Sequence, residues 1–592
     1  MKSLSLSQRQ ASLANRRSGG LSVRKTGLLV LTILCWSGPL AAADVERFSH
    51  AVVAADHPLA SKAGIEILQK GGNVVDAAVA TSFALSVVRP ASCGIGGGGF
   101  MLIWNASAQK AIAIDYRERA PAKATRDMFI PARGRDSADE PSRVGPLAVA
   151  VPGTVAGLCY AQKAHGKLDL QTVMQPAIRL ARDGFAIDEH DREAQSAMLR
   201  MFAAHPLRRE RFGSLYRRYL NNGAAWKPGD RFVSPQARLL EMIAEQGSDA
   251  FYRGPVADAI IAAMQRGGIV SADDLKSTRP IVREPLRGEF DGDTILAMPP
   301  PSSGGIALME SLNIIAAWEK LHPADTLTAV GFDAPPAQHL LVETLKFAFA
   351  DRANHLGDAD FVNVPTARLT GAKHAESIAA RIKPERTLAT SEYGRRIAPD
   401  DAGTSHFSVI DADGNAVSCT ETINLAYGSL VVVPEFGIVL NNEMDDFAAE
   451  PGKANAFGLM QGEANSIAPG KKPLSSMCPT IVLRDGKAVH ALGASGGPRI
   501  ISATLQVLLR MKRQGMSPSD AVSATRIHHQ WLPDVLEVDE AQLETLRPEL
   551  ERRGHTVKHL QSSSAAQAVT RSEKGTLSGG SDPRKHGKPA GY

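Results

Sequence analysis

Apolar and polar residues alternate around one tight turn in the last third of the chain. Residues 407–410 read Phe-Ser-Val-Ile, the chain turns at Asp413 and Gly414, and residues 416–419 return as Ala-Val-Ser-Cys. Asp-Gly supplies the positive φ angles that short hairpin turns require, so this pattern predicts two antiparallel strands. Residues 485–486, also Asp-Gly, predict a second hairpin in the same way.

Helical spacing of apolar residues prevails before the first hairpin. After a buried strand over 49–55, it predicts helices over 57–71, 76–88, 170–181, 235–246, 307–321 and 336–353. Residues 370–402 are polar, and we expect them to be mobile and exposed. Strands prevail after residue 404, with helices near 500–512 and 540–552. The chain is therefore predicted to have an α+β fold.

The glycine-rich segment 94–99 formally matches the G-x-G-x-x-G pattern of dinucleotide-binding loops. That loop needs a strand before it and a helix after it, whereas here the predicted helix 76–88 precedes and a predicted strand over 100–104 follows. We expect instead that these glycines let the backbone pass close to another backbone or to a ligand. His528 and His529 lack the spacing of metal ligands on a helix, so neither a metal nor a cofactor is expected.

The formal net charge of +5 over 592 residues is concentrated at the start of the chain. Six basic residues and no acidic residue precede Asp44, so the remaining chain carries a formal charge of −1. A nearly neutral body gives no electrostatic reason to expect nucleic-acid binding. The arginine-rich stretch 200–219 is therefore interpreted as an ordinary amphipathic surface.

The same basic start is followed by an apolar run over 27–36 and by three alanines at 41–43, a pattern typical of a secretory signal peptide. An uncleaved membrane anchor is the alternative, although the run is shorter than the ~20 residues that span a bilayer. We expect cleavage after Ala43 and a periplasmic or secreted protein. Export permits disulfides, but four scattered cysteines are expected to be buried apolar residues (Cys93, Cys159, Cys419 and Cys478).

Thr404 stands at the mouth of the first hairpin, behind Gly403, and ordered motifs follow it. They read Asn-Asn-Glu-Met-Asp-Asp-Phe at 441–447, Pro-Leu-Ser-Ser-Met at 473–477 and Gly-Ala-Ser-Gly-Gly-Pro-Arg at 493–499, after Asp-Tyr-Arg-Glu at 115–118. With these motifs the chain resembles the γ-glutamyltransferases (γ-glutamyltranspeptidases), which are self-cleaving N-terminal-nucleophile hydrolases. The resemblance spans essentially all of the chain after the signal segment.

This resemblance implies a four-layer αββα sandwich to which two fragments of one precursor contribute. The expected organisation is a signal peptide at 1–43, a large subunit at 44–403 and a small subunit at 404–592, the last two forming a heterodimer. After signal removal no membrane contact is expected. The expected substrates are glutathione and other γ-glutamyl compounds, with water, amino acids or dipeptides as acceptors.

The chemistry implied for Thr404 has two stages. Its hydroxyl first attacks the Gly403 carbonyl, and hydrolysis of the resulting ester releases Thr404 as a new N-terminus whose α-amine serves as its base. The freed threonine then takes up and passes on the γ-glutamyl group. The resemblance implies that Thr422 orients the nucleophile and that the N–H groups of Gly496 and Gly497 stabilise the oxyanion.

The resemblance also implies how the γ-glutamyl group is held at both ends. The residues for its α-carboxylate are Arg117, Ser475 and Ser476, and those for its α-ammonium are Asn424, Glu443 and Asp446.

Two positions depart from relatives. Glu443 stands where some relatives carry Gln and adds a charge, and Phe457 stands where bacterial relatives often carry a lid tyrosine. We expect the loss of that hydroxyl to shift the balance between hydrolysis and transfer.

Three other interpretations remain open. A Ser405–His406 triad is disfavoured because neighbours on a strand point to opposite faces. A cephalosporin (glutaryl) acylase acts on an acyl chain without an α-amine, and the presence of Asn424, Glu443 and Asp446 disfavours it. The third possibility is an uncleaved peptide-binding protein.

Overall fold

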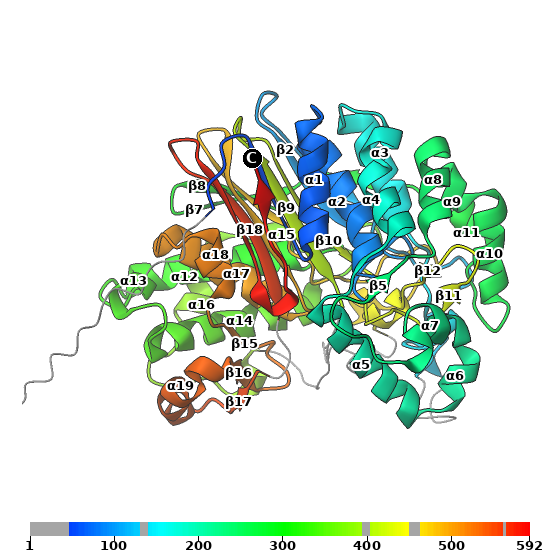
Figure 1. The fold of residues 1–592 in the computed structure, drawn as a ribbon. Helices are drawn as coiled ribbons and strands as arrows, with labels where there is room; N and C mark the ends of the chain where they lie inside the picture. Colours follow the sequence, from blue (N-terminus) through cyan, green and yellow to red (C-terminus); the bar gives the residue numbers. More distant parts are fainter. Residues whose placement is uncertain (1–45, 131–139, 394–402, 449–461, 561–563) are drawn as a thin grey trace, which may run out of the picture. The chain divides into compact units, whose positions relative to one another are not determined.

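The computed structural model describes residues 46–130, 140–393, 403–448, 462–560 and 564–592. The predicted signal peptide and Phe457 lie outside these residues. Two antiparallel sheets form the centre of the fold (Figure 1). The first has the order β20 (Ala590–Gly591), β1 (Ala51–Ala55), β9 (Ser405–Asp411), β10 (Ala416–Thr422), β2 (Gly98–Asn105), β3 (Lys110–Asp115) and β6 (Ile281–Arg283). The second has the order β19 (Leu577–Ser581), β18 (Ala565–Arg571), β14 (Lys487–Ser495), β13 (Thr480–Arg484), β8 (Asp293–Ala297) and β7 (Leu286–Phe290).

The two sheets pack against each other, with β9 on β14 and β18, and β1 on β19. The period-two alternation of a strand divides its side chains between two cores. Along β1, Val52 and Ala54 belong to the core shared with the second sheet. Ala51, Val53 and Ala55 belong to the core that the first sheet shares with its helices.

Helices cover the outer sides of both sheets (Figure 1). On the first sheet they include α1 (Pro58–Gln69), α2 (Val74–Val88) and α3 (Thr154–His165), and α4 (Leu170–Asp183) packs on α2. On the second they include α12 (Gly304–Leu321) and α17 (Arg499–Arg513), and α14 (Pro335–His355) packs on α12. All residues of α2 are buried, because this helix is apolar on every side and lies between the sheet and its neighbours.

Most predicted elements are confirmed. Both hairpins form, and Gly414 and Gly486 at their turns have φ values of +88° and +73°. The four described cysteines are free; Cys159 is half-buried and the other three are buried.

The prediction that residues 370–402 are mobile and exposed is wrong for part of the segment. Residues Ala372–Ala379 form α16, in which Ala375, Ile378 and Ala379 are buried against α12. A narrow apolar stripe at helical spacing is enough to bury one face of a largely polar segment. Residues 394–402 lie outside the described part of the chain.

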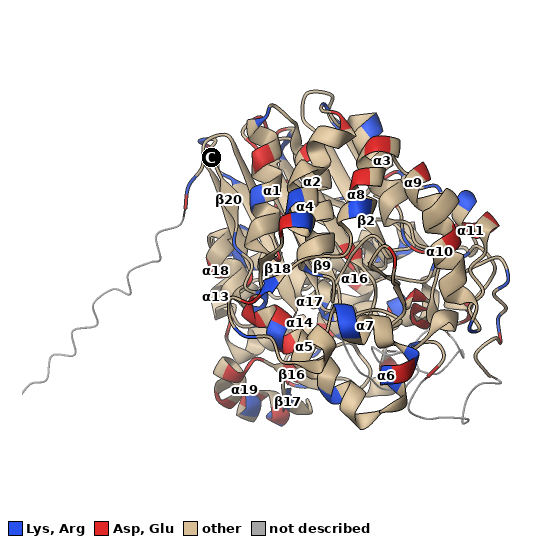
Figure 2. Ribbon diagram, turned by 45° about the vertical axis from the view of Figure 1, so that its right-hand side comes forward, with Lys and Arg blue, Asp and Glu red and all other residues tan. Residues whose placement is uncertain are grey.

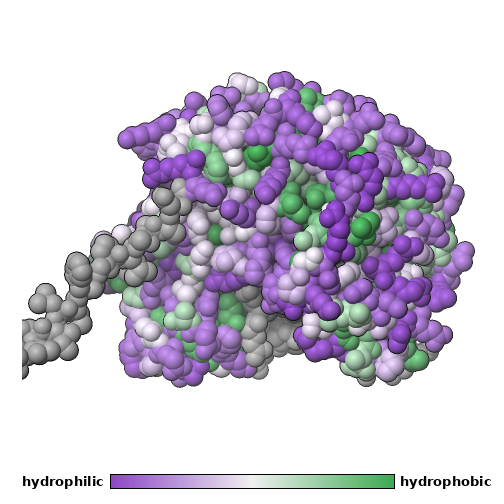
Figure 3. Space-filling view, in the orientation of Figure 1, coloured by the Kyte–Doolittle hydropathy of each residue, from purple (hydrophilic) through white to green (hydrophobic). Residues whose placement is uncertain are grey.

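The surface carries mixed charge and scattered apolar residues. Figure 2 shows basic and acidic residues interspersed along the outer helices. In Figure 3 the visible face is largely hydrophilic, with apolar residues in small patches. Among the described residues, no helix is both long enough and apolar enough to cross a bilayer.

Candidate active site

The first hairpin brings Thr404 and Thr422 together at one end of its two strands. Thr404 immediately precedes β9 and Thr422 ends β10, and the two hydroxyl oxygens lie 3.2 Å apart. Both hydroxyls also lie within hydrogen-bond distance of the Gly403 carbonyl oxygen, at 2.5 Å for Thr404 and 3.0 Å for Thr422. The Asn424 N–H donates to the Thr422 hydroxyl over 2.8 Å. The peptide bond before Thr404 is thus flanked by two hydroxyl groups.

Glycines let the backbone pack closely around this pair. Gly403 has a φ of +93°, and a Cβ there would lie 2.4 Å from the Asn424 carbonyl oxygen. In the glycine segment 94–99, a Cβ on Gly97 would lie 2.0 Å from the Thr422 carbonyl oxygen. The expectation of close backbone approach at this segment is therefore confirmed, and the approach fixes the position of Thr422.

Arg117 follows β3 and is buried among carboxyl groups. Its guanidinium donates to Glu443, and to Asp446 over 2.5 Å, while Glu118 lies 3.8 Å away. Glu443 and Asp446 belong to one short 3₁₀ helix, Glu443–Asp446. The residues predicted to hold the two ends of an amino acid therefore contact one another directly.

Burial and charge oppose each other in this cluster. Burial by itself lowers the pKa of Arg117, but attraction to Glu443, Asp446 and Glu118 outweighs it, so the pKa is raised. Burial raises the pKa of Glu443 well above its usual range, and Arg117 offsets this only in part. Burial likewise raises the pKa of Glu118 to about 7. Part of the protein therefore carries a proton on this cluster near neutral pH.

Ser475 and Ser476 lie in a loop that is tied to the segment before α12. The Ser475 N–H donates to the Pro301 carbonyl over 2.9 Å, and its carbonyl accepts from the Ser303 hydroxyl over 2.6 Å. Arg352 of α14 donates to that Ser303 hydroxyl over 2.9 Å and to the Ser476 hydroxyl over 3.4 Å. Arg352 is buried, and burial lowers its pKa to about 10. A second cationic side chain thus supports the serine loop.

Gly496 and Gly497 join β14 to α17, with φ values of +116° and +56°. Gly497 lines the same small pocket as every predicted side chain, whereas Gly496 is not among the lining residues. The pocket is lined by Arg117, Thr404, Thr422, Asn424, Glu443, Asp446, Ser475, Ser476, Met477, Gly497 and Ile500.

Ser405 and His406 do not form a catalytic pair. His406 points between the sheets, where its ring nitrogens contact the Thr420 hydroxyl at 2.8 Å and the Ser408 hydroxyl at 3.0 Å. Burial lowers the pKa of His406 to about 3, so the ring is neutral. Neighbouring residues of a strand point to opposite faces, as predicted, so Ser405 and His406 do not face each other.

His528 and His529 make structural contacts. The ring of His528 contacts the Ser502 hydroxyl at 2.9 Å, and the ring of His529 accepts from the Trp531 N–H over 3.0 Å. Both residues are buried.

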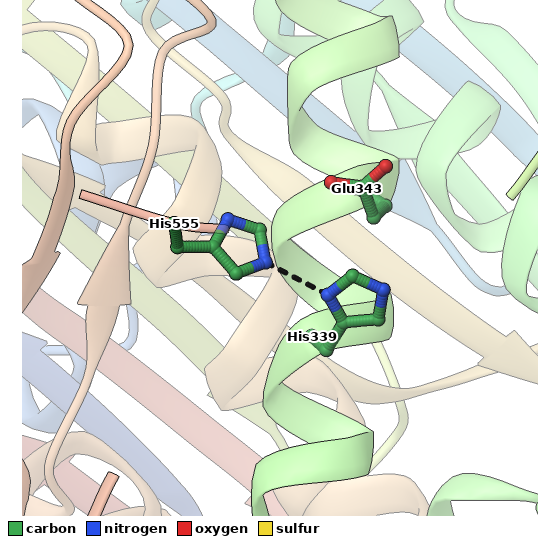
Figure 4. Close-up of side chains that lie close together, drawn as sticks. All are labelled: His339, Glu343 and His555. Carbon is green, nitrogen blue, oxygen red and sulfur yellow. Dashed lines mark hydrogen bonds between the residues drawn. The ribbon is translucent and has the colours of Figure 1, made fainter. Parts of the chain in front are cut away.

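Another buried group of potential metal ligands lies outside the pocket (Figure 4). His339 and His555 share a hydrogen bond of 2.7 Å between their rings, and the other nitrogen of His339 contacts the Lys383 carbonyl at 2.8 Å. Glu343 accepts from the Thr387 hydroxyl over 2.6 Å. The bond to His555 joins α14 to the segment that follows α19 (Glu540–Arg552), and the bonds to Lys383 and Thr387 join α14 to the segment that follows α16.

Two residues near the site were missed by the sequence analysis. Arg352 contacts the serine loop, and Lys585 donates to the Thr404 carbonyl over 2.5 Å. Arg352 stands in α14 beside other charged residues such as Lys346 and Asp351, so the local pattern does not single it out. Nothing in the local pattern around Lys585 indicates its partner.

The model of one protein family, gamma-glutamyltranspeptidase, matches residues 60–592. The chain belongs to the gamma-glutamyltranspeptidase family. Among curated family relatives, the "Glutathione hydrolase proenzyme" of Escherichia coli is 40% identical over 542 residues, which cover 91% of each chain. Membership confirms the resemblance inferred from the motifs.

Solved structures extend this comparison. A cephalosporin acylase from Bacillus halodurans matches with a TM-score of 0.79 and 26% identity, covering 95% of this chain and 99% of that one. The Helicobacter pylori gamma-glutamyltranspeptidase matches with a TM-score of 0.51 and 38% identity, covering 57% of this chain and 93% of that one. The mixed α+β fold predicted from the sequence agrees with both.

Proposed function

We propose that this gamma-glutamyltranspeptidase family member cleaves itself between Gly403 and Thr404 and then hydrolyses glutathione or transfers its γ-glutamyl group. The observation that carries the proposal is the geometry at Gly403, whose carbonyl lies beside the hydroxyls of both Thr404 and Thr422. The pocket that Thr404 and Thr422 line also contains a buried cation and two carboxyl groups, which suit the two charged ends of an amino acid.

Self-cleavage begins when the Thr404 hydroxyl oxygen attacks the Gly403 carbonyl carbon. The C–N bond breaks, the nitrogen takes up a proton as an α-amine, and an ester joins Gly403 to the threonine oxygen. Water then hydrolyses the ester and leaves a carboxylate on Gly403 and a free N-terminal Thr404. The Thr422 hydroxyl polarises the carbonyl during the first step.

Turnover repeats this acyl transfer on an external amide. The Thr404 hydroxyl attacks the γ-carbonyl of the donor while its own α-amine accepts the hydroxyl proton. The proton passes to the leaving amine, and a γ-glutamyl ester remains on Thr404. Water or the amino group of an acceptor then attacks this ester. Gly496 and Gly497 donate N–H groups to the oxyanion in both half-reactions.

A bound donor separates the charges that contact each other in the pocket. Its α-carboxylate binds Arg117, Ser475 and Ser476, and its α-ammonium binds Asn424, Glu443 and Asp446. The ion pairs of Arg117 with Glu443 and Asp446 support this assignment, because they place the cationic and anionic groups side by side.

The proposed molecule is a heterodimer of residues 44–403 and 404–592, folded as one αββα sandwich. Two facing sheets with helical cores on their outer sides support the layering. Both proposed subunits contribute strands to the first sheet, where β9 lies between β1 and β10 and β10 pairs with β2, so cleavage leaves the pieces paired. We further propose that residues 1–43 direct export and that the protein is periplasmic or secreted, on the basis of the sequence pattern described above.

The second candidate function is a cephalosporin-type acylase, which the similarity to the Bacillus halodurans structure favours. An acyl chain without an α-amine would leave Glu443 and Asp446 without an ammonium partner, a costly arrangement for buried carboxylates. The γ-glutamyl function is therefore the better supported of the two.

Electrophoresis and a substrate pair test these proposals. Purified protein should run as two fragments under denaturing conditions, whereas Thr404→Ala should run as one. The protein should release p-nitroaniline from γ-glutamyl-p-nitroanilide faster when an acceptor dipeptide is added, and it should act poorly on glutaryl-p-nitroanilide. Faster release from the glutaryl compound would favour the acylase, and a chain that never splits would refute both enzymes.

A further inference from the structure

Lys585 is a charged residue that contacts the backbone of Thr404 directly. It ends the short turn Pro583–Lys585 near the C-terminus, and its ammonium group donates to the Thr404 carbonyl oxygen over 2.5 Å. Thr404 lies just outside β9, so this lysine contacts the nucleophile where the strand begins. The two residues are 181 positions apart in the chain.

The surrounding residues hold Lys585 in place. Its ammonium group also donates to the Asp56 carboxylate over 3.1 Å, and its backbone carbonyl accepts from Arg89 over 3.1 Å. Arg89 donates in addition to the Asp56 carbonyl over 3.2 Å. Asp56 accepts from Gln567 over 2.5 Å, and only 14% of the Lys585 side chain is exposed. The lysine is therefore positioned before any substrate binds.

Self-cleavage changes what this contact does. Once the bond to Gly403 is broken, Thr404 is a chain end, and the hold on its carbonyl helps to keep its hydroxyl beside Thr422. The freed α-amine must also be neutral to accept a proton. Backbone dimensions place an amine nitrogen about 3 Å from the carbonyl oxygen of the same residue, so the Lys585 charge lies within roughly 6 Å of it. A like charge at that distance disfavours the ammonium form.

Other charged groups lie around Lys585 and Thr404. On the large-fragment side, Arg89 adds positive charge but is paired with the carboxylates of Asp188 and Asp191. Asp56 opposes the effect, and it contacts Lys585 itself. Burial lowers the pKa of His57 to about 3 and that of His190 to about 2, so both rings are neutral.

Two more titratable groups lie on the strand side. Burial raises the pKa of the Cys93 thiol to about 12, so it stays neutral. Burial raises the pKa of Glu421 on β10 to about 7, so Glu421 needs its own control. On the substrate side stand Arg117 and its carboxylates, which a bound amino acid holds in their charged forms.

We propose that Lys585 is a positioning residue for the nucleophile: its ammonium group holds the Thr404 carbonyl and keeps the freed α-amine uncharged and able to accept a proton. This inference rests on the proposed function, because it requires Thr404 to act as an N-terminal nucleophile.

The test measures kcat against pH at saturating γ-glutamyl-p-nitroanilide, because kcat reports groups in the substrate complex. Lys585→Met should shift the acidic limb of kcat upward by about one pH unit and lower kcat about tenfold at pH values on that limb, with little change in KM. Lys585→Gln keeps a hydrogen-bond donor without the charge and should show the same shift. Lys585→Arg keeps the charge and should restore the parent profile.

Lys588→Met is the matched control, because Lys588 is on the same tail but pairs with Glu46 at the surface, 3.5 Å away. Its profile should equal that of the parent. The inference is overturned if Lys585→Met and Lys585→Gln keep the parent profile, or if Glu421→Gln removes the acidic limb. The inference is also overturned if Lys585→Met and Lys585→Gln unfold at the parent temperature but do not cleave themselves. Lys585 would then act in self-cleavage, before any α-amine exists.

Thr404→Ala separates this inference from the proposed function. An active Thr404→Ala protein would refute both proposals. An inactive Thr404→Ala protein, together with a Lys585→Met variant of unchanged profile, would refute only the role of Lys585.

Discussion

Replacing Glu443 with Gln removes one titrating carboxyl group from the buried cluster around Arg117. In the parent protein one guanidinium faces the carboxyl groups of Glu118, Glu443 and Asp446, and Glu118 has a pKa of about 7. An α-ammonium binds best when these carboxylates are ionised. The KM for a γ-glutamyl donor should therefore rise as the pH falls through neutrality, because the cluster takes up a proton that opposes binding.

The size of the effect follows from Coulomb's law and from the strength of charged hydrogen bonds. Two carboxylates on one guanidinium, about 5 Å apart, repel each other by roughly 3 kcal/mol at an effective dielectric constant of 20. Partial solvation and sharing with Arg117 reduce this, and the repulsion acts on Glu443, whose pKa lies well above its usual range. Glu443→Gln should therefore remove the carboxyl group that takes up a proton first on acidification and leave Glu118, with its pKa of about 7, as the group that titrates. At pH values above the titration of this cluster, Glu443→Gln exchanges a charged hydrogen-bond acceptor for a neutral one. This should cost about 1.4 kcal/mol of donor binding, or about tenfold in KM.

The assay is the KM for γ-glutamyl-p-nitroanilide between pH 5.5 and 8.5. In Glu443→Gln, the rise of KM on acidification should begin about one pH unit lower, and KM at the alkaline end should be about tenfold higher. Glu463→Gln is the control, because Glu463 makes an exposed ion pair with Arg126. An unchanged pH dependence of KM in Glu443→Gln would refute the assignment of this cluster to the ammonium end of the donor.

Two further substitutions test the positions of the hydroxyl pair and of the glycine segment. Thr422→Val removes a hydroxyl that lies 3.2 Å from the Thr404 hydroxyl, so kcat should fall about tenfold with KM nearly unchanged. Thr422→Ser keeps the hydroxyl and should retain most activity. A Val variant as active as the parent would contradict the orienting role of Thr422. Gly97→Ala places a Cβ 2.0 Å from the Thr422 carbonyl oxygen and should lower the free energy of unfolding by about 3 kcal/mol. Gly288→Ala is the control, because its Cβ meets only the flexible Met309 at 3.4 Å, and it should change this free energy little. Thermal or chemical denaturation measures both.

Local patterns predicted the elements well because their causes are local. The Asp-Gly turn at 413–414 needs positive φ, and alternating apolar residues need two faces, so the hairpin could be derived from a few neighbouring residues. Because its two strands are of equal length, Thr404 and Thr422 had to meet at their open end. The segment 370–402 misled for the opposite reason, since a three-residue apolar stripe in α16 has meaning only beside α12.

The site itself depends on contacts between distant parts of the chain. Arg117 meets Glu443 across 326 positions, and family motifs, rather than periodicity, put both residues into the predicted site. Their direct ion pair was not predicted, because each had been assigned to a different end of the substrate. Arg352 and Lys585 carry no motif that was recognised, and their roles become visible only when the sheets and the C-terminal turn are assembled.

The central claim is that Thr404 becomes an N-terminal nucleophile and carries the γ-glutamyl group. Intact-mass spectrometry of the purified protein, quenched with acid during turnover of a γ-glutamyl donor, tests it most directly. We predict a fragment that begins at Thr404 and gains the mass of one γ-glutamyl group, and a Thr404→Ala chain that stays whole and gains nothing. A whole parent chain, or an adduct on the fragment that ends at Gly403, would contradict the account.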